Sequence, residues 1–204
     1  MRIAWSWCLL ALRDAMISRE QKRKIVAFAN RQYRNNDRYH RARHIGEVVA
    51  RALWLARMEH ADRDACWASA LLHDIAKSRR GDHGAIGAKE ARALLTGVGV
   101  DGRTVGKVYD AIYFHNKGFS GGPIERRILW DSDKWNVFTS EGFRNRVVKC
   151  FEMTISDRKA LARKLESEYR LLTHFHTKEG RKHEEKSTPV IERLISEMKE
   201  THSQ

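Results

Sequence analysis

Ala68-Ser69-Ala70-Leu71-Leu72-His73-Asp74-Ile75-Ala76-Lys77 is the stretch that decides how this chain folds. Its apolar residues predict a buried helical run, and that run ends in an imidazole and a carboxylate, His73 and Asp74. Burial of such groups is unfavourable unless other groups satisfy them. We expect a divalent metal ion to do so. The more ordinary alternative is a buried histidine that bonds to its neighbouring carboxylate.

Two further segments supply groups that would complete a metal site. Residues 41–58 predict a helix in which His44 shares one face with apolar residues such as Val48, so that His44 points inward. Asp131 and Asp133 lie in a later predicted helix, and because they are two residues apart their side chains face different ways. With one of these aspartates, the chain would offer a set of two histidines and two aspartates.

The order and the surroundings of these residues resemble the HD superfamily of metal-dependent phosphohydrolases, whose pattern is a lone His, a His-Asp doublet and a lone Asp, all on helices. The resemblance covers about residues 40–137, and three segments carry it: His44-Ile45-Gly46-Glu47-Val48-Val49-Ala50, Ala70-Leu71-Leu72-His73-Asp74-Ile75-Ala76-Lys77 and Ile128-Leu129-Trp130-Asp131-Ser132-Asp133-Lys134-Trp135. It implies metal binding by four residues: His44, His73, Asp74 and Asp133. Asp133 is preferred because the family's ligand precedes a Lys- or Arg-plus-apolar pair. Asp131 would then either hold a metal ligand in place without binding the metal itself or face solvent.

Two more histidines match positions at which some HD subfamilies carry additional ones. His83 opens a helical run, and His115 ends an apolar stripe to which Val108 and Ile112 belong. By resemblance, both histidines would bind a second metal ion or the phosphate of the substrate, and with two ions Asp74 would bridge them. The alternative is that each is a core histidine satisfied by hydrogen bonds.

The ligand set also defines the chemistry that the resemblance implies. Imidazole and carboxylate ligands suit manganese, Ni, Co, Fe, Mg or Zn, and the site would hold one ion or two. Such an ion ionises coordinated water near neutral pH and neutralises phosphoryl charge, with Asp74 as the catalytic ligand. Lys77 would be the second catalytic residue, offering a point charge to phosphate. The equal alternative is that Lys77 is only a cation that stabilises the C-terminal end of its helix.

Composition and periodicity predict an all-α fold. The 204 residues contain two prolines, 42% hydrophobic residues and 32% charged residues. We expect an HD-domain helical bundle with additional C-terminal helices, divided into an N-terminal extension (1–18), an HD core (19–140) and a C-terminal helical extension packed on the same domain (141–204). Three cysteines without disulfide or zinc spacing favour a reducing, cytoplasmic compartment.

Helix boundaries follow from caps and turns. Ser18 to Gln21 has the pattern of a capping box that opens a helix, and Asp62 and Asp82 are expected N-caps. The helix that begins after Asp62 is expected to continue to Lys77. Near the C-terminus, residues 178–186 predict a charged loop, followed by a last helix from Pro189. Three histidines in this part are expected to be exposed: His174, His176 and His183.

The net charge of +13 is concentrated toward the N-terminus, because residues 1–60 hold 13 Lys and Arg against 5 Asp and Glu. Arg41 and Arg43 directly precede His44, so they are expected to draw an anionic substrate toward the metal. The alternative is a solvated basic helix face. The N-terminal apolar run, which ends at Leu12, is too short to cross a bilayer, so no membrane partner is expected.

Three functions are compatible with these residues. The first is a metal-dependent phosphohydrolase, a phosphomonoesterase or phosphodiesterase, that cleaves a small phosphorylated metabolite, with nucleotides as the best class. The second is an HD-type nuclease for single-stranded nucleic acid, which the basic N-terminal third favours. The third is a non-catalytic regulatory domain with a structural metal ion, favoured by Asn136, where many relatives carry an acid.

Overall fold

The computed structural model describes residues 17–35, 42–117, 121–139, 142–143, 148, 158–172 and 174–200. Most of the predicted N-terminal extension lies outside these ranges, as does Arg41. The described residues form helices and no strand, which confirms the all-α prediction. The helices are α1 (Arg19–Gln32), η2 (Tyr33–Asn35), α2 (Ala42–Met58), α3 (Arg63–Leu72), α4 (His83–Gly97), α5 (Gly102–Phe114), α6 (Ile124–Trp135), α9 (Arg158–Leu172) and α10 (Lys178–Glu200).

Side chains cap the helices where the sequence predicts it. The Ser18 hydroxyl accepts from the Gln21 amide, and the Gln21 side chain accepts from the Ser18 amide, which completes the capping box of α1. Asp62 caps α3 and Asp82 caps α4, each by accepting backbone N–H groups of the first turn. These carboxylates satisfy amides that have no partner within the helix and complement its dipole.

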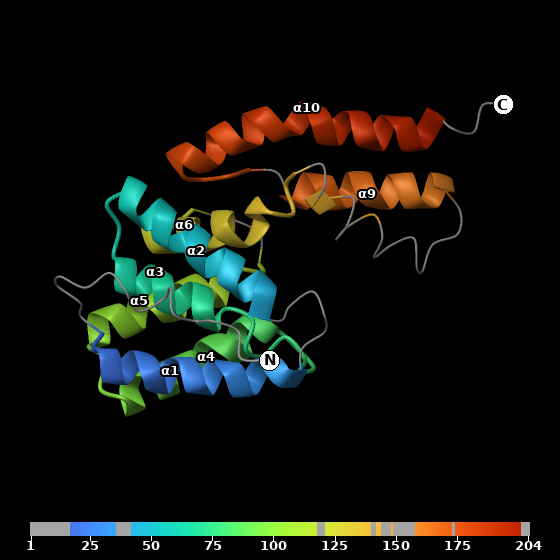
Figure 1. Ribbon diagram of the computed structural model, residues 1–204. Helices are drawn as coiled ribbons and strands as arrows, with labels where there is room; N and C mark the ends of the chain where they lie inside the picture. Colours follow the sequence, from blue (N-terminus) through green and yellow to red (C-terminus); the bar gives the residue numbers. More distant parts are fainter. Residues whose placement is uncertain are drawn as a thin grey trace.

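Helix α3 runs through the middle of the bundle, between α2 and α5 (Figure 1). All its residues from Asp64 to Leu72 are buried, and α2, α5 and α6 each pack against it. Its small side chains allow this close packing. The buried apolar residues of α1 to α6 form one core cluster, which places the end of α3 well inside the protein.

Helix α3 ends at Leu72, so the prediction that it continues to Lys77 was wrong. The Tyr33 hydroxyl, which is buried, donates to the Leu71 carbonyl at 2.8 Å. That carbonyl would otherwise accept the amide of Ile75, which instead reaches the Leu72 carbonyl at 3.4 Å. Residues 73–78 therefore form a series of turns, and His73 and Asp74 lie just beyond the helix.

Helices α9 and α10 run antiparallel and project beyond the bundle (Figure 1). They share a second core with Phe138 and Phe143. Helix α10 begins at Lys178, so the predicted charged loop at 178–186 was wrong. Pro189 lies inside this helix, where water can satisfy the backbone groups on its exposed side. None of the described helices is both long and apolar enough to traverse a bilayer.

A buried ion pair attaches α1 to the bundle. Lys22 Nζ lies 2.6 Å from Asp64 Oδ1, and both side chains are about nine-tenths buried. Asp64 Oδ2 also accepts the Ile17 amide at 2.8 Å. Removal of the carboxylate would leave a buried ammonium ion and a buried N–H group without this partner.

We predict that Asp64→Ala lowers the free energy of unfolding by about 3 kcal/mol, because breaking a buried ion pair leaves an uncompensated charge. Urea denaturation followed by circular dichroism measures the change. Glu20→Gln is the control, since the Lys24–Glu20 pair is largely exposed and should contribute little. Equal stability of Asp64→Ala and the parent protein would contradict the prediction.

Candidate metal centre

The structure brings together the four residues expected to bind a metal ion. Helix α2 supplies His44, the turn after α3 supplies His73 and Asp74, and α6 supplies Asp133. His44 Nε2 lies 3.2 Å from Asp133 Oδ1, and His73 Nε2 lies 3.6 Å from the same oxygen. The second oxygen of Asp74, Oδ2, lies 3.3 Å from His73 Nε2. Two helices and the turn that follows a third thus converge on one polar cluster.

His83 and His115 join this cluster on the other side of Asp74. His83 Nε2 lies 3.6 Å from Asp74 Oδ1, and His115 Nε2 lies 3.5 Å from the same atom. Two groups result, each compact enough to hold a metal ion: His44, His73 and Asp133 in the first, and Asp74, His83 and His115 in the second. Asp74 lies between them, with Oδ2 toward the first group and Oδ1 toward the second.

Backbone carbonyls orient two of the imidazole rings. His73 Nδ1 donates to the Ala70 carbonyl at 2.9 Å, and His115 Nδ1 donates to the Ile112 carbonyl at 2.6 Å. A carbonyl only accepts, so each neutral ring carries its hydrogen on Nδ1 and its lone pair on Nε2. Neither Nε2 atom has a hydrogen-bond partner among the described residues, although both are buried. Imidazoles held in this way by a carbonyl are typical of metal ligands.

The carboxylates favour positive charge in the first group. Burial opposes ionisation of Asp74 and Asp133, but the charge of His73 beside Asp74, and that of Lys134 beside Asp133, lower their pKa well below the usual range. Burial likewise opposes protonation of His73, but the charges of Asp74 and Asp133 raise the pKa of His73 above its ordinary value. A divalent cation among these groups would satisfy the same carboxylates, so the residues fit a metal ion.

His83 provides a neutral imidazole. Burial, together with the charges of Lys77 and His115, lowers the pKa of His83 to about 4. Lys77 Nζ lies 3.4 Å from His83 Nε2, and Asn116 Nδ2 lies 3.3 Å from His83 Nδ1. Lys77 therefore stands beside the second group, where an anionic ligand would meet its charge.

Sequence reasoning missed a role for Lys134. Its ammonium group contacts the Asp133 carboxylate, lies 3.4 Å from the His115 carbonyl oxygen and is 4.7 Å from the centre of the Trp130 ring. The side chain is largely buried and stands between the two groups. The only sequence signal was its place directly after Asp133, which served to choose between two aspartates.

Asp131 does not face solvent, so that alternative was wrong. It is fully buried and accepts backbone N–H groups of His176 and Thr177, just before α10. His183 was expected to be exposed, but it is half-buried because it stacks on Trp135. Arg43 is exposed and pairs with Glu47 at 3.0 Å, while Arg41 lies outside the described residues.

Comparisons with known proteins agree with this arrangement. A family model described as the HD domain matches residues 41–136. A predicted HD superfamily hydrolase from an uncultured Thermotogales bacterium has a TM-score of 0.62 at 23% identity, covering 86% of this chain and 89% of its own. A Bacillus thuringiensis HD-superfamily hydrolase has a TM-score of 0.62 at 20% identity, covering 91% and 98%.

Bacillus subtilis YpgQ, solved in complex with ADP, has a TM-score of 0.68 at 19% identity, covering 90% of this chain and 96% of its own. A search of curated proteins found no match. At these identities the solved structures establish similarity of fold. The family match covers the helices that carry the His, His-Asp and Asp residues in the family's order. Residues 41–136 of this chain are therefore an HD domain.

Proposed function

We propose that this chain is a metal-dependent phosphohydrolase. The observation that carries the proposal is the convergence of four histidines and two aspartates into two groups that share Asp74 as their boundary. The HD hydrolase fold supports metal-dependent hydrolysis in general. Hydrolysis of a phosphoester is the reaction that suits ligands of this kind beside partly buried lysines.

The first group would hold one ion through His44, His73 and Asp133, with Asp74 as a further ligand through Oδ2. Asp74 Oδ1, His83 and His115 would hold a second ion or the phosphate of the substrate. A divalent cation bound there would supply a Lewis acid that lowers the pKa of coordinated water and neutralises phosphoryl charge. Manganese is one of the ions that such ligands suit.

The chain's own residues provide orientation and charge. Carbonyls of α3 and α5 fix the rings of His73 and His115, so that their Nε2 atoms point toward the carboxylates. The ammonium of Lys77 lies beside the second ligand group, and that of Lys134 lies between the two ligand groups. Each can bind phosphate oxygens there. Burial keeps bulk water away and strengthens these electrostatic interactions.

We further propose that the substrate is a small phosphorylated metabolite, with nucleotides as the best class. YpgQ, which shares the fold, was solved with ADP. Arg43 is exposed on the first turn of α2, beside His44, and would attract an anionic substrate, as would Arg41. Location in the cytoplasm and the packing of the C-terminal extension on one domain stay predictions from the sequence.

We predict that the protein releases phosphate from at least one member of a nucleotide panel in the presence of Mn²⁺, Ni²⁺, Co²⁺ or Mg²⁺. Asp74→Ala should lower that rate at least about 100-fold, because it removes the carboxylate shared by both groups. Glu185→Ala, an exposed change on α10, is the control. Unchanged turnover in Asp74→Ala would place the reaction elsewhere, and cleavage of single-stranded DNA or RNA alone would favour a nuclease.

The two groups can be counted by metal analysis. We expect His44→Asn and His115→Asn each to remove one equivalent of bound Mn²⁺, since each variant lacks a ligand of only one group. Isothermal titration calorimetry and elemental analysis give the stoichiometry. If the parent protein binds one equivalent and only His44→Asn removes it, the second group serves phosphate instead.

Cation binding should become tighter as pH rises from 6 to 8. The carboxylates raise the pKa of His73, so that imidazole holds a proton in this range, and the cation must displace it. In the absence of a cation, the proton on His73 stabilises the folded protein. This contribution is fully present below the ordinary histidine pKa, and it is lost as pH rises through the raised pKa. Calorimetry in buffers of different ionisation enthalpy should detect proton release. A dissociation constant independent of pH would contradict the prediction.

A further inference from the structure

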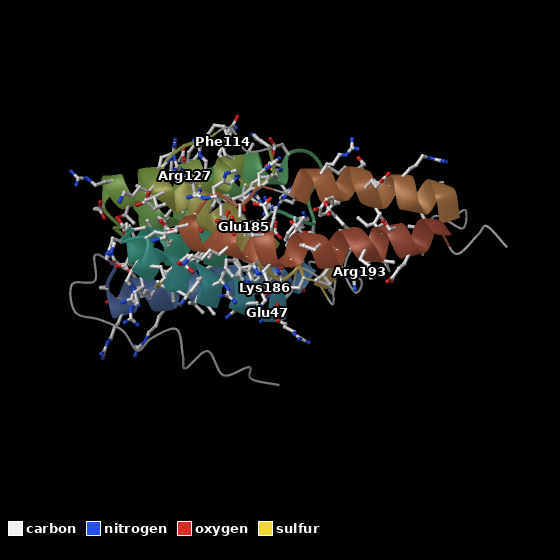
Figure 2. The ribbon with its side chains drawn as sticks, turned by 90° about the horizontal axis from the view of Figure 1, so that it is seen from above. Glu47, Phe114, Arg127, Glu185, Lys186 and Arg193 are labelled. Atoms are coloured by element: carbon white, nitrogen blue, oxygen red, sulfur yellow. The ribbon has the colours of Figure 1, made fainter. Side chains whose placement is uncertain are left out.

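Helix α6 stands between the metal centre and the start of α10. Asp133 extends from α6 toward His44 and His73. Asp131 and Trp135, which are one turn apart, contact α10 and the residues just before it. Seen from above, the part of α10 that carries Glu185 and Lys186 lies over the bundle, whereas Arg193 lies on the part that projects beyond it (Figure 2).

Asp131 binds the start of α10 through both carboxylate oxygens. Oδ1 accepts the His176 amide at 2.9 Å. Oδ2 accepts the Thr177 amide at 2.8 Å and the Thr177 hydroxyl at 2.6 Å. Asp131 is fully buried, with 0% relative accessibility, so these donors replace water as its partners. An anion at this place also complements the positive end of the α10 dipole.

The fit between α6 and α10 leaves no room for a side chain at Gly180. A Cβ atom at this position would lie 2.2 Å from Asp131 Oδ2 and 2.8 Å from Thr177 Oγ1. The Thr177 hydroxyl oxygen in turn accepts the Gly180 amide at 2.9 Å. Thr177 therefore caps α10 and anchors it to α6 through the same oxygen.

Two further contacts extend this attachment. The His183 ring stacks on Trp135, with ring centres 4.1 Å apart and an interplanar angle of 9°. His183 Nε2 lies 3.0 Å from the Trp135 carbonyl oxygen, to which it donates. On the other side, the Lys178 amide donates to Glu59 Oε1 at 2.7 Å, one residue past the end of α2.

We propose that residues 176–183, here called the α10 brace, position Asp133 for metal binding by fixing α6 relative to α2. The brace contacts α6 on both sides of Asp133 in the sequence, and it contacts the end of the helix that carries His44. It thereby sets the relation between His44 and Asp133, which belong to the same group. This inference rests on the proposed metal centre.

Thr177→Val tests the brace, because it keeps the shape of the side chain but removes the hydroxyl that binds both Asp131 and Gly180. We expect the dissociation constant for Mn²⁺, measured by calorimetry on the full chain, to rise about tenfold, as is usual when the support of a metal ligand is lost. Thr177→Ser, which keeps the hydroxyl, should bind Mn²⁺ as the parent does. Gly180→Ala should weaken binding as Thr177→Val does.

Leu194→Ala separates positioning from stability. Leu194 is buried in the core shared by α9 and α10, away from the brace, so its truncation should lower the melting temperature without changing the dissociation constant. If Thr177→Val lowers the melting temperature but binds Mn²⁺ as tightly as the parent, the brace has only a structural role. Equal loss of affinity in Leu194→Ala would also overturn the proposal.

Two outcomes distinguish the brace from the proposed function. Failure of the parent protein to bind Mn²⁺, Ni²⁺, Co²⁺ or Mg²⁺ overturns both the brace and the proposed function. Cation binding that is unchanged in Thr177→Val overturns the brace alone. If Thr177→Val does not fold, Glu59→Gln carries the same prediction with a smaller effect, because it weakens only the contact to α2. Parent-like affinity in Glu59→Gln and Gly180→Ala together would then refute the brace.

Discussion

The burial of ionised carboxylates among imidazoles is the constraint on which the rest of this structure depends. Asp74 is 3% exposed and His73 is fully buried, so neither can rely on water. Their partners must come from the protein or from a cation. The small residues of α3 let α2, α5 and α6 approach closely enough to bring His44, His115 and Asp133 to this point. The packing of the bundle and the chemistry of the site are thus consequences of one arrangement.

The same local device orients two of the histidines. His73 and His115 each follow the last residue of a helix, and each ring donates to the carbonyl three residues earlier. Carbonyls at a helix C-terminus have no partner within the helix, so the ring satisfies one of them and is itself held in place. Helix ends therefore serve two purposes here. They stop the helix at the site, and they direct a ring nitrogen toward the carboxylates.

Local pattern was enough to predict part of this structure. The caps at Ser18, Asp62 and Asp82 depend on neighbouring residues, and they form as the sequence predicts. The end of α3 does not follow from local pattern, since the Tyr33 hydroxyl that takes a carbonyl of α3 comes from far away in the chain. The start of α10 is hidden for the same reason, because its early amides bind Asp131 and Glu59.

Asp131 and Asp133 show which part of the site the local sequence leaves open. The position of Lys134 favoured Asp133 as the metal ligand, but nothing in the local sequence indicated the partners of Asp131. The two aspartates are separated by one residue on the same helix, and both are carboxylates removed from most solvent. Asp131 is satisfied by N–H and O–H donors at the start of α10, and burial nevertheless raises its pKa to about 6. Asp133 instead faces two imidazoles and Lys134, which lower its pKa. One helix thus presents an acid to a helix N-terminus and another to cationic groups, and only the tertiary fold decides which acid meets which partner.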